Sequence, residues 1–85
     1  MMPTISQFYG IQVVMHFKQK EHYPPHLHAR YGENEASFYL SNGEIFHGDF
    51  PARGKKLIKE FILKNKKELM EMWDKEIYKK LPPIK

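Results

Sequence analysis

Three of the five histidines in this 85-residue chain lie within seven residues, at His22, His26 and His28. If the residues after Pro25 form a strand, His26 and His28 share a face, because side chains two residues apart on a strand point the same way. Two imidazoles about 6–7 Å apart can bind one metal ion. Imidazole also titrates near neutral pH, so the pair could act as general acid and base. The alternative is that both are half-exposed polar residues on the outer face of a strand.

A complete metal site is not expected around this pair. Glu33 extends it to His-x-His-x4-Glu, which resembles the first metal motif of the cupins. The cupin fold needs two sheets and a second motif with its own histidine, and this chain is too short to supply them. Because the chain has no cysteine, it also lacks a thiolate ligand. We therefore predict that the protein binds no stoichiometric metal ion and needs no cofactor.

Arg30 follows on the same predicted face and completes a set that could cleave RNA without a metal. One histidine would take the proton of the 2′-hydroxyl, the other would protonate the leaving oxygen, and the guanidinium would stabilise the developing charge. The candidate catalytic residues are therefore His26, His28 and Arg30. Many surfaces that only bind carry the same residue types, so the sequence leaves open whether the protein is an enzyme.

Four strands and one helix are expected to position these residues in a single domain, residues 1–85. Apolar alternation predicts strands over residues 11–17, 26–31, 35–40 and 44–50. A helix is expected over about 55–75, because its apolar residues fall on an arc of roughly 160°, and residues 79–85 are expected to form a loose tail. The predicted class is α+β, with a small, mostly antiparallel four-stranded sheet packed on one long C-terminal amphipathic helix.

The register of the last hairpin decides which side chains join the histidines. A two-residue Asn42-Gly43 loop would place Phe38 opposite His47, whereas a three-residue loop with Gly43 in a left-handed conformation would place Phe38 opposite Phe46. The second register separates apolar from polar side chains more cleanly, so it is preferred. It predicts that Phe46 faces the helix. It also predicts an outer face on which the histidine pair and Arg30 are joined by further binding residues, namely His16, Tyr39, His47 and Asp49.

Composition excludes several classes of protein. A chain without cysteine has no disulfide framework and no cysteine nucleophile. No apolar run approaches the roughly 18 residues of a membrane span and no secretory start is visible, so we expect a cytoplasmic protein without membrane association. Residues 51–85 hold eleven basic and five acidic residues, against three and five in residues 1–50. The basic third could attract nucleic acid or an acidic partner, or it could be a solvated lysine-rich helix.

Several segments resemble the bacterial domain-of-unknown-function family 4160. They run from Met2 to Ile11, from Pro24 to Glu33 (PPHLHARYGE), from Asn42 to Glu44 and from Gly48 to Pro51. The resemblance covers nearly the whole chain, through the helix with Trp73. The hallmark residues of the family correspond here to Pro24, Pro25, His26, His28, Tyr31 and Gly32. Tyr31 is therefore added to the expected binding residues.

The resemblance implies a partner but no mechanism. Such genes resemble halves of two-gene operons beside members of the 2442 family, an arrangement suspected to be toxin–antitoxin-like, which implies a protein partner encoded nearby and RNA or DNA as further candidates. The preferred hypothesis is a binding component of such an operon, docking through the histidine face or through an apolar seam at Leu63 and Met70. The alternative is a small metal-free ribonuclease-like toxin that uses His26 and His28.

Overall fold

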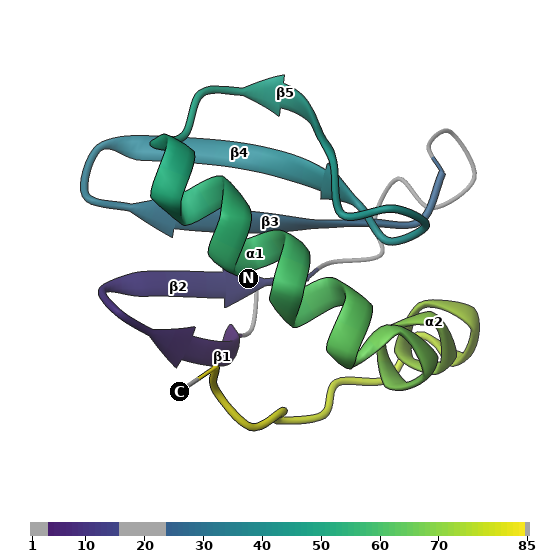
Figure 1. The fold of residues 1–85 in the computed structure, drawn as a ribbon. Coiled ribbons are helices and arrows are strands. Elements are labelled where there is room, and N and C mark those ends of the chain that lie inside the picture. Colours follow the sequence, from purple (N-terminus) through teal and green to yellow (C-terminus); the bar gives the residue numbers. More distant parts are fainter. Residues whose placement is uncertain (1–3, 16–23, 85) are drawn as a thin grey trace.

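The computed structural model describes residues 4–15 and 24–84, which form one antiparallel sheet with two helices on one side of it (Figure 1). The strands follow one another across the sheet in chain order. The elements are β1 Thr4–Phe8, β2 Ile11–Val14, β3 His26–Tyr31, β4 Asn34–Tyr39, β5 Ile45–Gly48, α1 Ala52–Lys64 and α2 Lys66–Lys75. The α+β class and the antiparallel sheet are as predicted. The number of strands, four, and the single long helix were both wrong.

The additional strand is β1, whose sequence does not alternate between apolar and polar residues. A bulge between Thr4 and Ser6 shifts its pairing with β2, so that Ile5 and Ser6 are both buried although they are neighbours. A bulge of this kind breaks the two-residue period on which strand prediction depends. The strand nevertheless adds Ile5 and Phe8 to the core, and the ring of Phe8 lies 5.2 Å from that of Phe61 in α1.

A second bulge changes the register of the last hairpin. Ala36 pairs with Gly48, as the preferred register predicts, and Gly43 has the expected left-handed φ of 73°. Between Ser37 and Phe38 the register shifts, so Phe38 lies opposite Ile45 and not opposite Phe46. The extra residue in β5 is Phe46, whose ring stacks on Tyr39. The prediction that Phe46 faces the helix was therefore wrong, because the bulge turns it to the other side of the sheet.

The predicted helix is divided at Asn65. This residue has φ −111° and ψ 21°, outside the helical range, and both its backbone N–H and its Nδ2 donate hydrogen bonds of 3.0 Å to the carbonyl of Phe61. Asparagine side chains compete in this way with helical hydrogen bonds, so the axis changes direction (Figure 1). The apolar residues of both helices stay buried in one core, namely Ile58, Phe61, Ile62, Leu69, Met72 and Trp73.

The core lies between the helices and one face of the sheet. Leu27 and Ala29 of β3 pair with Phe38 and Ala36 of β4, and all four side chains are buried on the helix side. His26, His28 and Arg30 alternate with them and so belong to the other side, which we call the outer face. Within the described ranges, 4–15 and 24–84, no helix is both long and apolar enough to cross a membrane.

The C-terminal segment is docked on the sheet, where the sequence predicted a loose tail. Leu81 and Ile84 are buried members of the core, and the backbone N–H of Leu81 donates a 2.8 Å hydrogen bond to the carbonyl of Ile5 in β1. Figure 1 shows this segment returning from α2 to β1. Since β1 was not predicted from the sequence, no packing site could be assigned to Leu81 and Ile84.

Tyr9 occupies a turn position that disfavours it. The two-residue turn between β1 and β2 has positive φ at both Tyr9 (50°) and Gly10 (78°), a geometry in which asparagine, aspartate and glycine are preferred. We expect Tyr9→Asn to keep or raise the free energy of unfolding, by up to about 1 kcal/mol, because asparagine enters the left-handed region at lower cost. Urea denaturation of the variant checks this, and a loss above about 1 kcal/mol would contradict it.

Candidate functional site

A cavity of about 380 Å³ opens on the outer face and brings together residues from three strands. Strand pairing brings these residues together, because His26 lies opposite Tyr39, His28 opposite Ser37, and Ser37 opposite His47. Side chains of directly opposed residues share a face. We call this cavity the histidine pocket, and it is lined by Pro24, His26, His28, Ser37, Tyr39, Phe46 and His47.

His26 is buried in the wall of the histidine pocket. Only 6% of the residue is exposed, and its ring lies 5.6 Å from that of Phe46 and 5.2 Å from that of Trp73. Its Nδ1 lies 2.9 Å from the carbonyl oxygen of Pro24. Since a carbonyl oxygen only accepts, Nδ1 donates this hydrogen bond. His26 is on the outer face, but the alternative that it is half-exposed was wrong, because α2 places Trp73 against it.

His28 is half-buried and bonded to the neighbouring strand. Its Nδ1 lies 3.1 Å from the Ser37 hydroxyl, and its ring meets that of His26 edge to face with 5.1 Å between the ring centroids. At this separation the two rings contact each other directly. A phosphate therefore does not fit between them, as it would have to if one ring were to act as base and the other as acid on opposite sides of a phosphodiester.

Tyr39, Phe46 and His47 form the opposite wall of the histidine pocket. The rings of Tyr39 and Phe46 are stacked with centroids 4.2 Å apart and planes tilted by 20°, while His47 is exposed. Sequence reasoning did not select Ser37 or Phe46 for the site. Strand alternation already placed Ser37 on the outer face, but nothing in the sequence marks the bulge that turns Phe46 there.

The remaining predicted site residues lie elsewhere. Arg30 is on the outer face, where its Nε donates a 3.1 Å hydrogen bond within an exposed ion pair to Glu35, but it does not line the pocket. Asp49 accepts a hydrogen bond from the backbone N–H of Phe50, and Tyr31 lines a different cavity. His16 lies outside the described residues.

The chemistry of the histidine pocket is that of rings and hydrogen-bonding groups. Among the residues that the structure describes, its lining contains three imidazoles, two stacked aromatic rings and the hydroxyls of Ser37 and Tyr39, and no lysine or arginine. In the part of the chain that the structure describes, no three histidine, aspartate or glutamate side chains come close enough together to hold a metal ion. Such a wall suits a side chain with a flat or apolar body that ends in a hydrogen-bonding group.

Comparison with known proteins identifies a family for most of this structure. A family model described as a domain of unknown function (DUF4160) matches residues 10–74, from the turn before β2 to the last turn of α2. The matched segment includes every residue that lines the histidine pocket. No curated protein and no solved structure matches the chain.

Proposed function

We propose that this chain, which belongs to the DUF4160 family, is a binding module whose histidine pocket receives a side chain of a partner protein. One observation carries the proposal: three strands place imidazole and aromatic rings around a cavity of about 380 Å³, and none of the described residues in its wall is a lysine or an arginine. Aromatic rings such as those of Tyr39 and Phe46 bury large areas, and aromatic side chains are enriched at interfaces.

The composition of the wall favours a protein over a nucleic acid at this pocket. Nucleic-acid affinity depends mainly on lysine and arginine that neutralise phosphates. On the outer face Arg30 is the described residue that could do so, and it is paired with Glu35 and lies outside the pocket lining. A partner side chain that presents a ring or an aliphatic body and a hydrogen-bonding tip matches the wall better.

The ribonuclease-like alternative has less support from the geometry. It requires His26 and His28 on opposite sides of a phosphate with Arg30 beside them. The two rings contact each other at 5.1 Å, His26 is held by Pro24, and the Arg30 guanidinium is engaged by Glu35. A metal-free cleavage with these residues would need the strand end at His26 to rearrange.

The partner we propose is the product of an adjacent gene. The family resemblance implies a two-gene, toxin–antitoxin-like arrangement, and a partner encoded nearby would explain a small module with a pocket suited to a protein side chain. This assignment makes the protein one component of a pair, in which binding regulates the activity of the other component or of the complex.

We expect His47→Ala to abolish co-purification with the adjacent gene product while leaving the fold intact. His47 is an exposed lining residue, so its loss should change stability by no more than about 0.5 kcal/mol. The measurement is co-expression of both genes, one carrying an affinity tag, followed by quantification of the untagged protein and of cell growth.

The matched control is Leu63→Ala, which removes an exposed apolar side chain from α1 on the opposite side of the sheet. This variant should co-purify like the parent. If Leu63→Ala releases the partner and His47→Ala does not, the partner docks on the helices and the pocket assignment is wrong. Cleavage of RNA by the purified parent that is lost in His28→Asn would favour the ribonuclease-like alternative.

A further inference from the structure

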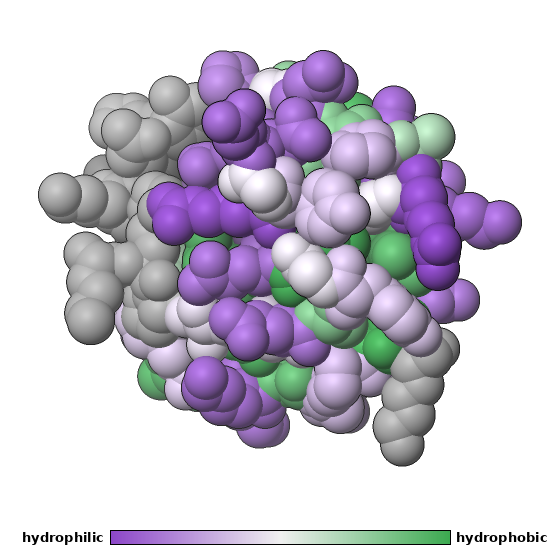
Figure 2. Space-filling view, turned by 90° about the vertical axis from the view of Figure 1, so that its left-hand side faces the viewer, coloured by the Kyte–Doolittle hydropathy of each residue, from purple (hydrophilic) through white to green (hydrophobic). Residues whose placement is uncertain are grey.

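A second cavity, of about 300 Å³, lies at the other end of the sheet and has a different chemistry. It is formed where the β1–β2 turn and the end of β3 approach the first turns of α1, at the left of Figure 1. Figure 2 views the molecule from this end and shows apolar groups recessed between polar side chains. We call it the tyrosine pocket, and it is lined by Tyr9, Ile11, Tyr31, Pro51, Arg53, Gly54 and Leu57.

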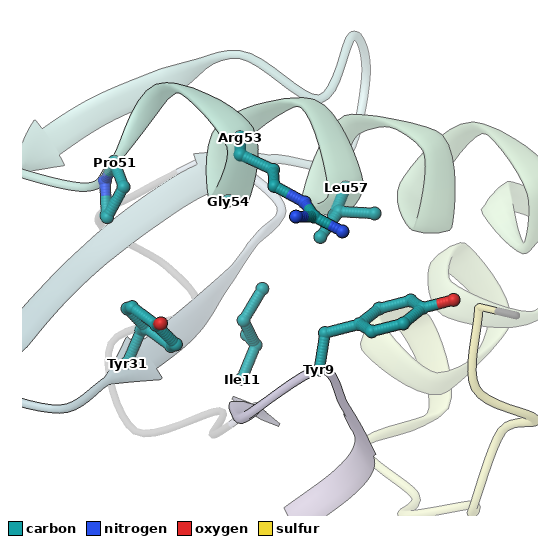
Figure 3. A pocket seen from close by; sticks show the side chains of 7 residues that line it. All are labelled: Tyr9, Ile11, Tyr31, Pro51, Arg53, Gly54 and Leu57. Carbon is teal, nitrogen blue, oxygen red and sulfur yellow. The ribbon is translucent and has the colours of Figure 1, made fainter.

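Two exposed tyrosines lie on either side of the base of the tyrosine pocket, which is formed by Ile11. In Figure 3, Tyr9 and Tyr31 stand on either side of Ile11, with α1 above them. Tyr9 is 53% exposed and Tyr31 44%, whereas Ile11 is buried. Neither ring is needed to fill the core, so the two tyrosines offer aromatic surface to something outside the chain.

Tyr9 has a strained backbone conformation, which keeps its side chain in this exposed position. Its φ of 50° is a left-handed conformation that non-glycine residues rarely adopt. Asparagine or glycine would form the same turn more easily. A large aromatic residue held in such a conformation and exposed to solvent indicates a role other than folding.

Tyr31 is held in place by its neighbours. A Cβ added at Gly10 would lie 3.1 Å from Cε1 of Tyr31, so the ring packs against the glycine of the turn. The ring also lies edge to face with that of Phe50, with 6.4 Å between ring centroids. The tyrosine ring is thus positioned before any ligand arrives, which lowers the entropic cost of binding.

Arg53 adds a cation to the rim of the tyrosine pocket. Its guanidinium carbon lies 6.0 Å from the centroid of the Tyr9 ring, and the side chain reaches down from α1 in Figure 3. Among the residues that the structure describes, Arg53 forms no ion pair. Lys55 and Lys56 follow on the same helix and are exposed, although neither lines the pocket. The rim is therefore suited to an anion.

We propose that the tyrosine pocket binds single-stranded nucleic acid, with a base stacked on Tyr9 or Tyr31 and a phosphate bound by Arg53. A nucleotide unit offers both features of the pocket at once, a flat ring and a nearby anion. An apolar peptide would leave the Arg53 guanidinium without a partner, and an acidic peptide would leave the two rings uncovered. The basic residues of the last third of the chain supply further attraction for a polyanion.

This site is separate from the histidine pocket, and the inference goes beyond the proposed binding of a partner protein. Among the described residues, the histidine pocket is lined by rings without a lysine or arginine, whereas the lining of the tyrosine pocket includes Arg53. One molecule could thus hold a protein on the outer face and a nucleic-acid strand at the end of the sheet.

The test is fluorescence anisotropy with a fluorescein-labelled oligouridylate and the full-length protein at low ionic strength. We expect Tyr31→Ala to weaken binding by about 5- to 150-fold, the effect of losing one base stack, and Tyr31→Phe to retain binding. Tyr9→Asn should weaken binding similarly while its melting temperature stays at or above that of the parent. Arg53→Gln should weaken binding and lower the slope of log affinity against log salt by about one.

The matched control for charge is Lys67→Gln, which removes one exposed cation from α2 outside the pocket and should change affinity less than about twofold. His47→Ala should bind the strand like the parent, so failure here is distinguishable from failure of the proposed function. The proposal is overturned if the parent does not bind, if Lys67→Gln and Arg53→Gln have equal effects, or if free uridine monophosphate binds as tightly as the strand. It is equally overturned if Tyr31→Ala releases the partner protein but binds RNA normally.

Discussion

Replacing Trp73 by alanine should lower the free energy of unfolding by about 3–5 kcal/mol, the range for removing a large aromatic ring from a core. Trp73 is only 3% exposed, and it connects the core under α2 with the His26 ring 5.2 Å away. Urea denaturation followed by circular dichroism measures the loss.

The conservative variant Trp73→Phe separates packing from a general effect of altering α2. It keeps an aromatic ring against His26, so its loss should be well below that of alanine. A change under about 1 kcal/mol for Trp73→Ala would mean that the ring contributes little to the core, and it would remove the physical basis for the buried position of His26.

Gly48→Ala should destabilise the protein by at least about 3 kcal/mol, and it should prevent folding if the sheet cannot adjust. A Cβ at this position would overlap the carbonyl oxygen of Glu35 and would lie 2.9 Å from the Cα of Ala36, both of them backbone atoms that are fixed by strand pairing. The φ of 86° adds a conformational cost for any residue with a side chain. Expression level and urea denaturation measure the effect.

Gly32→Ala is the matched control for this substitution. Gly32 also has a positive φ, 58°, but a Cβ there meets no atom within 4 Å. Only the conformational cost remains, so we expect a loss of about 1–2 kcal/mol. If both alanine variants lose the same amount, close approach of β4 and β5 at Gly48 is not the dominant constraint.

The sequence predicted those parts of the fold that follow a regular period. The alternation around Leu27 and Ala29 places β3 correctly, and the apolar stripe from Leu57 to Trp73 identifies the helical residues that enter the core. Each error in the fold arises at a single residue. The bulge beside Ser6 concealed β1, and Asn65 divides the helix without interrupting its apolar stripe.

The candidate site was predictable to the extent that strand alternation determines it. His28, Tyr39 and His47 share the outer face as expected and line one pocket with His26. The burial of His26 could not be predicted, because it depends on the direction of α2 after Asn65, which brings Trp73 to the start of β3. Arg30 lies on the outer face, as strand alternation predicts. It follows His28 by two residues along β3, where it pairs with Glu35 and does not line the pocket.

The hydrogen bond from the backbone N–H of Leu81 to the carbonyl of Ile5 also affects the tendency of the protein to aggregate. An open sheet has two edge strands with unpaired backbone groups, and such edges can recruit strands from other molecules and start aggregation. Here the last residues cover β1, with Leu81 bonded to its backbone and Ile84 buried beside the core. The other edge strand, β5, is four residues long and carries a bulge, which makes it a poor template. By covering the β1 edge, the C-terminal segment should therefore reduce self-association of the sheet.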